Sequence, residues 1–199
     1  MTRRLSVLLD KQEIHEATLR YCRGVDRLDR DLIRSAYHDD AVDHHGGYSG
    51  PVEVVIARLL DRLSSCYEST THLIGNQLID VEGNEADAET YFVAFHILRQ
   101  DIPDLEMIGG TRVCHLTVLG RYVDRFTRRN YTWRITSRTV VFDSIQTGSS
   151  RATVPEAIRN TAVFGSRDLS DPSYRPMLVK DRRAGDRAST PKRPIGDNG

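Results

Sequence analysis

The sequence predicts an α+β fold in which N-terminal helices pack against one face of a curved antiparallel sheet. Two observations predict it: residues 11–63 show helical periodicity with one short strand inserted, and residues 73–144 are strand-like, rich in Val, Ile, Thr and aromatic residues. Helices gathered ahead of consecutive antiparallel strands are typical of this class. A cone-shaped sheet with an open mouth would bury both layers.

Three helices are expected in the first third of the chain. Apolar residues at three- and four-residue steps predict an amphipathic helix over residues 11–22 that ends near Gly24. A second, shorter helix opens at Asp29. A short strand over residues 41–46 runs into a Gly-Gly turn, and Pro51 is well placed to start the third helix.

Four antiparallel strands are expected to follow as a meander, separated by polar turns: residues 73–81, 86–98, 107–126 and 131–144. Beyond Gly148 the composition shifts to Arg, Asp, Ser, Pro and Gly, with a short helix expected over residues 154–163 and disorder from Ala184. The predicted organisation is therefore a catalytic α+β domain over residues 1–148 and a C-terminal extension over residues 149–199.

The composition argues against several classes of partner. The 28 basic and 28 acidic side chains among 199 residues give a net charge of zero, whereas nucleic acid or anionic lipid would call for a basic surplus. No uncharged apolar run has membrane-spanning length, and the amino terminus lacks a signal-peptide core. Three widely spaced cysteines without a C-x-x-C pair fit reduced thiols in a cytoplasmic protein. We expect a small molecule or another protein chain as the partner.

Asp26 and His72 are the residues best suited to acid–base chemistry. If the fold brings them together, the carboxylate fixes the tautomer of the imidazole and stabilises the imidazolium that forms when the ring takes a proton. Such a pair is a general base that needs neither metal nor cofactor. The competing interpretation is a structural histidine satisfied by a nearby acid.

Asp43 and His45 share one face of the expected short strand, whereas His44 points to the other face. His45 is thereby placed as a second acid–base group that protonates a leaving group, with Asp43 tuning it. A solvated histidine pair explains the same residues equally well. A metal site at these histidines is disfavoured, because adjacent histidines on a strand point apart.

Tyr21 would donate a hydrogen bond to a substrate oxygen, but only if its helix ends or distorts near Gly24. Otherwise five helical steps set it about 140° from Asp26 around the axis. Arg138 on the last strand would be buried if the sheet curves over it, and it would then require an anion. That anion is a substrate oxygen, Asp43, or the partner in a plain structural ion pair. Apolar surface for an aromatic or alicyclic substrate is expected from one face of the later strands: Tyr91, Val93, Phe95 and Tyr122. Ordinary core packing accounts for each of these residues as well.

Five motifs occur together between residues 9 and 144: Gly-Val-Asp26, Asp40-Ala-Val, Gly50-Pro51, Thr-His72-x-x-x-Asn76 and Asp124-Arg125-Phe126-x-x-Arg129-x-x-x-Trp133-Arg134-Ile135. With this order of elements they resemble the nuclear transport factor 2-like superfamily in its polyketide-cyclase-like, or SnoaL-like, branch. Within that branch the motifs are similar to those of scytalone dehydratase, bile-acid 7-alpha-dehydratase and hexachlorocyclohexane dehydrochlorinase.

The resemblance implies a cone-shaped pocket with an Asp–His dyad, no metal or cofactor, and a homo-oligomer, usually a trimer, with a dimer as the alternative. It assigns Asp26 and His72 to the dyad, Tyr21 to a pocket tyrosine and Arg138 to a pocket arginine. The His-His-Gly-Gly run at residues 44–47 departs from the pattern of the relatives, so protonation of the leaving group would be handled differently here.

The function expected from these residues and this resemblance is that of a cofactor-independent, dehydratase-like lyase acting on a hydrophobic cyclic or aromatic small molecule. The same base would serve a retro-aldol cleavage that releases formaldehyde from an aryl-propanediol, or a double-bond isomerisation. The other class is a non-catalytic binding or assembly subunit, such as the small subunit of a ring-hydroxylating dioxygenase, which needs no dyad.

Overall fold

The computed structural model describes residues 3–100, 107–108, 111–150 and 155–174. The chain divides into two compact units, Met1–Val163 and Phe164–Gly199. The first unit carries the helices and the sheet. The predicted functional boundary at residue 148 stays a prediction.

The helices of the first unit are α1 (Arg3–Arg27), α2 (Arg30–Ser35), α3 (Val52–Cys66) and α4 (Glu156–Arg159). The prediction that the first helix ends near Gly24 is wrong, because α1 continues to Arg27 and ends where Leu28 takes a positive φ of 55°. Gly24 instead permits close helix packing: a Cβ there would lie 2.6 Å from Cγ1 of Ile33 on α2. Asp29 caps α2 by accepting a hydrogen bond from the Leu32 N–H at 2.9 Å.

The main sheet has the strand order β2-β1-β8-β7-β4-β3. Its strands are β1 (Tyr37–His45), β2 (Tyr48–Pro51), β3 (Tyr67–Glu82), β4 (Glu85–Leu98), β7 (His115–Arg129) and β8 (Thr132–Gly148). The predicted antiparallel meander is confirmed by the consecutive pairs of β3 with β4, β4 with β7 and β7 with β8. β1 joins it in parallel to β8.

Several strand boundaries differ from the prediction: β1 begins at Tyr37 rather than at residue 41, and β8 ends at Gly148 rather than at residue 144. Two further differences concern β3 and the segment before β7. β3 begins at Tyr67 rather than at residue 73, so His72 lies inside the strand, with Ala94 as its cross-strand partner. The expected strand over residues 107–126 is interrupted, because Met107–Ile108 (β5) pairs only with Thr111–Arg112 (β6). The pairing of β7 with both β4 and β8 starts at His115.

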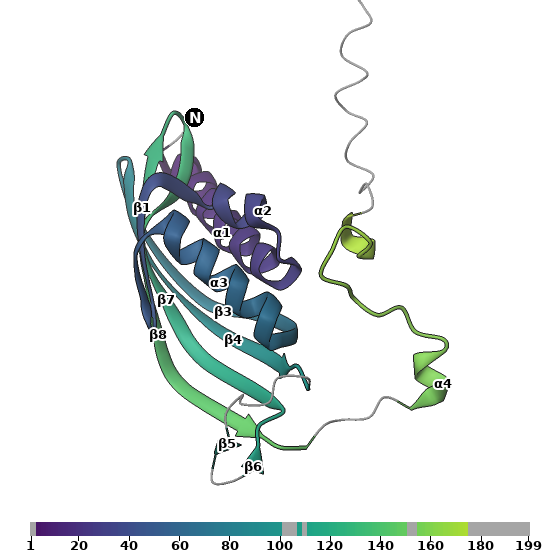
Figure 1. Cartoon of the computed structure of the whole chain (residues 1–199). Coiled ribbons are helices and arrows are strands. Elements are labelled where there is room, and N and C mark those ends of the chain that lie inside the picture. The colour runs from purple at the N-terminus through teal and green to yellow at the C-terminus, as the bar shows by residue number, and fades with distance from the viewer. Residues whose placement is uncertain (1–2, 101–106, 109–110, 151–154, 175–199) are drawn as a thin grey trace, which may run out of the picture. The chain divides into compact units, whose positions relative to one another are not determined.

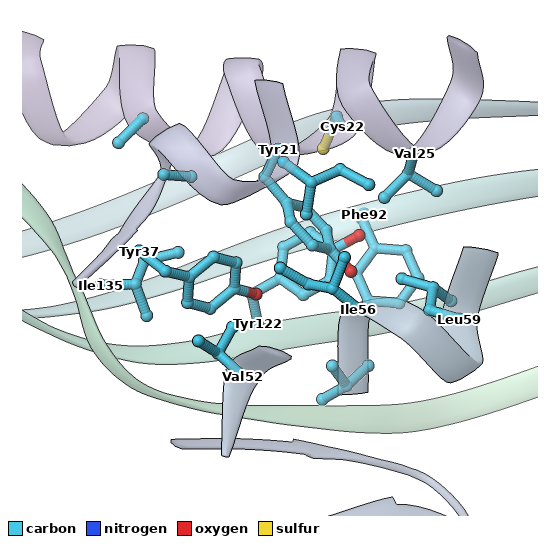
Figure 2. Close-up of a cluster of buried hydrophobic side chains, with 14 of the residues drawn as sticks. Tyr21, Cys22, Val25, Tyr37, Val52, Ile56, Leu59, Phe92, Tyr122 and Ile135 are labelled. Atoms are coloured by element: carbon cyan, nitrogen blue, oxygen red, sulfur yellow. The ribbon is translucent and has the colours of Figure 1, made fainter. Parts of the chain in front are cut away.

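The helices α1, α2 and α3 cover one face of the curved, unclosed sheet, as the α+β prediction required (Figure 1). The core lies between these layers. Figure 2 shows Tyr21 and Val25 of α1 meeting Tyr122 and Phe92 of the sheet, with Ile56 of α3 beside them. Burial of such side chains is the main term that holds helices to sheet.

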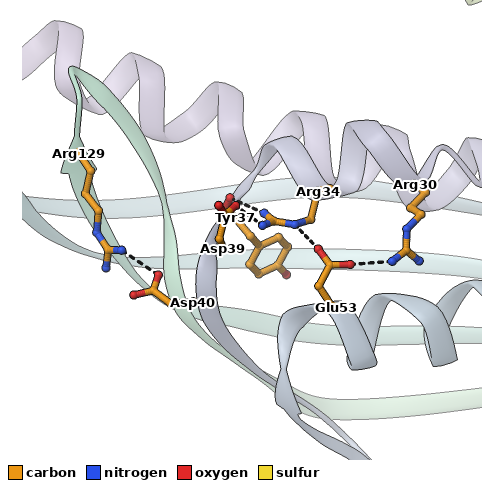
Figure 3. A network of polar contacts seen from close by, with 7 residues as sticks. All are labelled: Arg30, Arg34, Tyr37, Asp39, Asp40, Glu53 and Arg129. Atoms are coloured by element: carbon orange, nitrogen blue, oxygen red, sulfur yellow. Dashed lines mark hydrogen bonds and ion pairs between the residues drawn. The ribbon is translucent and has the colours of Figure 1, made fainter.

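Exposed ion pairs tie α2 and α3 to β1 (Figure 3). Glu53 of α3 accepts a hydrogen bond from Arg30 at 2.6 Å and also contacts Arg34, which donates to the Tyr37 carbonyl at 2.8 Å. Exposed pairs of this kind contribute little free energy each. They lie at the start of the strand that carries Asp43 and His45.

The remaining described segments are short. α4 is shorter than the helix predicted over residues 154–163, and in the second unit Asp171 accepts hydrogen bonds from the Ser166 and Ser173 N–H groups, both at 2.9 Å. The segment predicted to be disordered from Ala184 lies outside the described residues.

Helices long and apolar enough to cross a membrane are absent from the described part of the chain. The three cysteines are free thiols.

Candidate active site

A cavity of about 510 Å³ lies on the helix-covered face of the sheet, and its described lining residues come mainly from α3 and from β1, β2, β3, β4, β7 and β8. Most of its wall is apolar, contributed by residues such as Leu59, Leu63, Leu116, Val118, Val140 and Phe142. Polar side chains interrupt this wall at a few places: His45, Tyr48, Arg62, Tyr67, His72, His96, Tyr122 and Thr147. An apolar cavity with a few convergent polar groups is the usual form of a small-molecule site.

Asp26 and His72 meet at the cavity wall. Nδ1 of His72 lies 2.6 Å from Oδ1 of Asp26, and the His72 backbone N–H donates to Oδ2 at 2.9 Å. The Thr70 hydroxyl also donates to Oδ1, at 3.1 Å. Only 9% of the His72 side chain and 13% of the Asp26 side chain are exposed. The carboxylate is therefore fixed by both backbone and side-chain donors.

This contact sets the tautomer of the ring. An ionised carboxylate only accepts hydrogen bonds, so Nδ1 of His72 carries the proton and Nε2 keeps its lone pair. Because His72 lines the cavity while Nδ1 is occupied, Nε2 is the ring nitrogen left for a bound molecule. His72 can therefore accept a proton at Nε2.

The face of β4 that lines the cavity is the opposite of the predicted one. Phe92, Ala94 and His96 line the cavity, whereas Tyr91 and Phe95 are 46% and 43% exposed on the other face with Val93. The reason is the register: His72 pairs with Ala94, and residues directly opposite in a ladder point to the same side. Alternation alone gives two faces without saying which is inward, so His96 and Phe92 were missed.

A second acid–histidine pair lies on β1. Asp43 is buried and His45 lines the cavity, while His44 is exposed, as the predicted alternation requires. Nδ1 of His45 lies 4.0 Å from Oδ1 of Asp43, too far for a hydrogen bond, and within the described structure neither atom has another partner. Oδ2 of Asp43 accepts from the Tyr37 hydroxyl at 2.7 Å. Burial lowers the pKa of His45, and the nearby Asp43 opposes that shift.

Arg138 is not among the described residues that line the cavity, but it packs against Tyr122, which is. Its side chain is fully buried and donates two hydrogen bonds to the Asp124 carboxylate, both at 2.7 Å. Its guanidinium carbon lies 4.1 Å from the Tyr122 ring centroid and 4.2 Å from that of Tyr21. Of the expected alternatives, the structure has the plain ion pair: the anion is Asp124, directly across the β7–β8 ladder, and neither Asp43 nor a substrate oxygen takes that place.

The two predicted tyrosines have different positions. Tyr122 lines the cavity, with its ring stacked on Phe92 at a centroid distance of 4.4 Å. Tyr21 is buried in the core with its ring against Tyr37 and Tyr122, and burial raises its pKa. It is not among the described residues that line the cavity. Among the described side chains, no group of three or more His, Cys, Asp and Glu residues is placed to hold a metal ion.

Comparisons with known proteins agree with this architecture. The family model of the SnoaL-like domain matches residues 6–139. Similar solved structures include the hexachlorocyclohexane dehydrochlorinase LinA-type3 from Novosphingobium barchaimii, with a TM-score of 0.61 and 17% identity, covering 76% of this chain and 98% of that one. A proposed scytalone dehydratase from Novosphingobium aromaticivorans has a TM-score of 0.59 and 16% identity, covering 75% and 94%.

A protein with a cystatin-like fold from Nostoc punctiforme is also similar, with a TM-score of 0.54 and 19% identity, covering 68% of this chain and 92% of that one. No curated protein matches the sequence. Similarity at identities this low shows a common fold, and the chemistry has to be argued from the residues of the site.

Proposed function

Because the chain belongs to the SnoaL-like domain family, we propose that it is a cofactor-independent lyase that eliminates water or another leaving group from a hydrophobic cyclic or aromatic molecule. The observation that carries the proposal is the 2.6 Å contact between His72 and Asp26 at the wall of an apolar cavity. The names of two similar structures, a dehydrochlorinase and a proposed dehydratase, describe eliminations and support the same class.

His72 acts as the base. Its Nε2 removes a proton from a carbon next to an electron-withdrawing group, the C–H electrons form the new double bond, and the leaving group departs with its own bonding pair. Asp26 holds the ring and stabilises the imidazolium through Nδ1. General base help of this kind is worth roughly a hundred- to ten-thousand-fold in rate.

His45 acts as the acid on another wall of the same cavity. Because burial lowers its pKa, His45 is mostly neutral near pH 7, and the smaller fraction that carries a second proton is the stronger acid toward a departing oxygen. The reaction then needs His72 neutral and His45 protonated. Asp43 adjusts the pKa of His45. Tyr21 and Arg138 pack against Tyr122 and hold its ring in place in the cavity wall.

The same base could serve a retro-aldol cleavage or an isomerisation, and the products separate these from elimination. A non-catalytic subunit is the weaker alternative, because a binding module does not need a largely buried carboxylate that makes three hydrogen-bond contacts with His72 and Thr70.

The test is a substrate panel incubated in D2O: aryl and alicyclic β-hydroxy and β-chloro ketones, together with aryl-propanediols. Mass spectrometry follows loss of water or chloride, release of formaldehyde, and deuterium uptake. We expect elimination by the wild-type protein, its loss in His72→Gln, and full activity in Asp80→Asn, an exposed change on the same strand. Turnover that persists in His72→Gln would overturn the proposal.

A further inference from the structure

Arg62 is a cavity residue that the acid–base chemistry does not use. It lies on α3, is solvent-exposed and lines the cavity, so it stands where the cavity meets solvent. Among the described lining residues it is the one arginine or lysine. The apolar side chains Leu59 and Leu63 flank it on the same helix. A cation bordering apolar surface attracts an anion more strongly than one in open water.

The position of Arg62 is linked to that of the base. Four polar side chains form a row along one wall of the cavity: Arg62, Tyr67, His96 and His72. Arg62 donates to the Tyr67 hydroxyl at 3.5 Å, and its guanidinium carbon lies 6.0 Å from that ring centroid. The centroids of Tyr67 and His96 are 5.0 Å apart, and those of His96 and His72 are 5.8 Å apart. The guanidinium of Arg62 and the ring of His72 are thus the first and last members of a series of contacts that passes through the rings of Tyr67 and His96.

We propose that Arg62 binds a carboxylate at one end of the substrate while His72 takes the proton near the other end. The substrate class is then an aryl or alicyclic carboxylic acid whose rings fill the apolar cavity between these two groups. A planar guanidinium suits a carboxylate because it offers paired parallel donors. This inference rests on the proposed function for the assignment of His72.

A matched control lies one helical turn away. Arg58 has the same charge and also stacks on an aromatic ring, with its guanidinium carbon 5.6 Å from the Tyr48 centroid, but it is not among the described lining residues. Arg58→Gln and Arg62→Gln therefore change the net charge equally. Both residues are exposed, so neither change disturbs the core.

The experiment measures the affinity of two probes of equal shape, para-phenylbenzoate and para-phenylbenzamide, by calorimetry at physiological salt. We expect wild-type protein and Arg58→Gln to bind the carboxylate about tenfold more tightly than the amide, and Arg62→Gln to bind both alike. Asp26→Asn should retain the preference, because the dyad lies at the other end of the row.

Equal binding of the two probes by the wild-type protein would overturn the carboxylate site and leave the apolar cavity of the proposed function intact. Equal losses in Arg58→Gln and Arg62→Gln would also overturn it, since the preference would then be a general charge effect. If the wild-type protein binds neither probe, that result would contradict both the carboxylate site and the proposal that the substrate contains aromatic or alicyclic rings.

Discussion

The two acid–histidine pairs on the cavity wall use the same residue types but differ in geometry. Asp26 and His72 are 46 positions apart and touch at 2.6 Å, whereas Asp43 and His45 share a strand and stay 4.0 Å apart. Residues two apart on a strand project side by side from points about 7 Å apart. A carboxylate on a helix that faces the strand can point directly at the imidazole nitrogen. Two residues that are close in sequence on one strand are therefore less able to form a hydrogen-bonded dyad.

The largest contrast between the pairs should appear in activity on a substrate found with the panel. We expect Asp26→Asn to lower kcat/KM by roughly a hundred- to ten-thousand-fold, because the amide cannot replace the ionised carboxylate that orients His72. Asp43→Asn should cost much less, since its contact with His45 is open at 4.0 Å. Steady-state kinetics on folded variants checks this, and equal losses in both would remove the distinction between the pairs.

Asp124→Asn should produce the largest change in stability. It would leave Arg138 as a fully buried cation without its anion, at a cost of about 3–5 kcal/mol in the free energy of unfolding. Arg125→Ala is the surface control: it removes an exposed pair with Glu85 and should cost at most about 1 kcal/mol. Denaturant unfolding measures both. Similar costs would mean that the buried ion pair between Arg138 and Asp124 contributes no more to stability than a surface contact.

The pair of Asp43 and His45 should also affect the pH dependence of the free energy of unfolding. Because burial lowers the folded-state pKa of His45, the unfolded chain binds this proton more tightly, and stability falls as pH drops below about 6.5. We therefore expect His45→Gln to lose less stability than wild type between about pH 7 and pH 5. The exposed neighbour variant His44→Gln is the control for removing a histidine from the same strand. A wild-type-like loss in His45→Gln would show that His45 is not held neutral by burial.

The sequence predicted the fold class and the meander well, because periodicity and turn residues are local signals. It predicted the Asp26–His72 contact only through family resemblance, since no local pattern joins a helix end to a strand interior. The inward face of β4 and the partner of Arg138 both depend on cross-strand register. The β7–β8 ladder carries a register shift between Arg125 and Phe126, and alternation cannot locate such an irregularity.

The central claim is that Asp26 orients His72 as the base, and nitrogen NMR of the imidazole rings tests it most directly. At alkaline pH, where the rings are neutral, we expect His72 to carry its proton on Nδ1 in the wild-type protein and to lose that preference in Asp26→Asn, while His45 stays unchanged. The same tautomer populations for His72 in both proteins would contradict the claim.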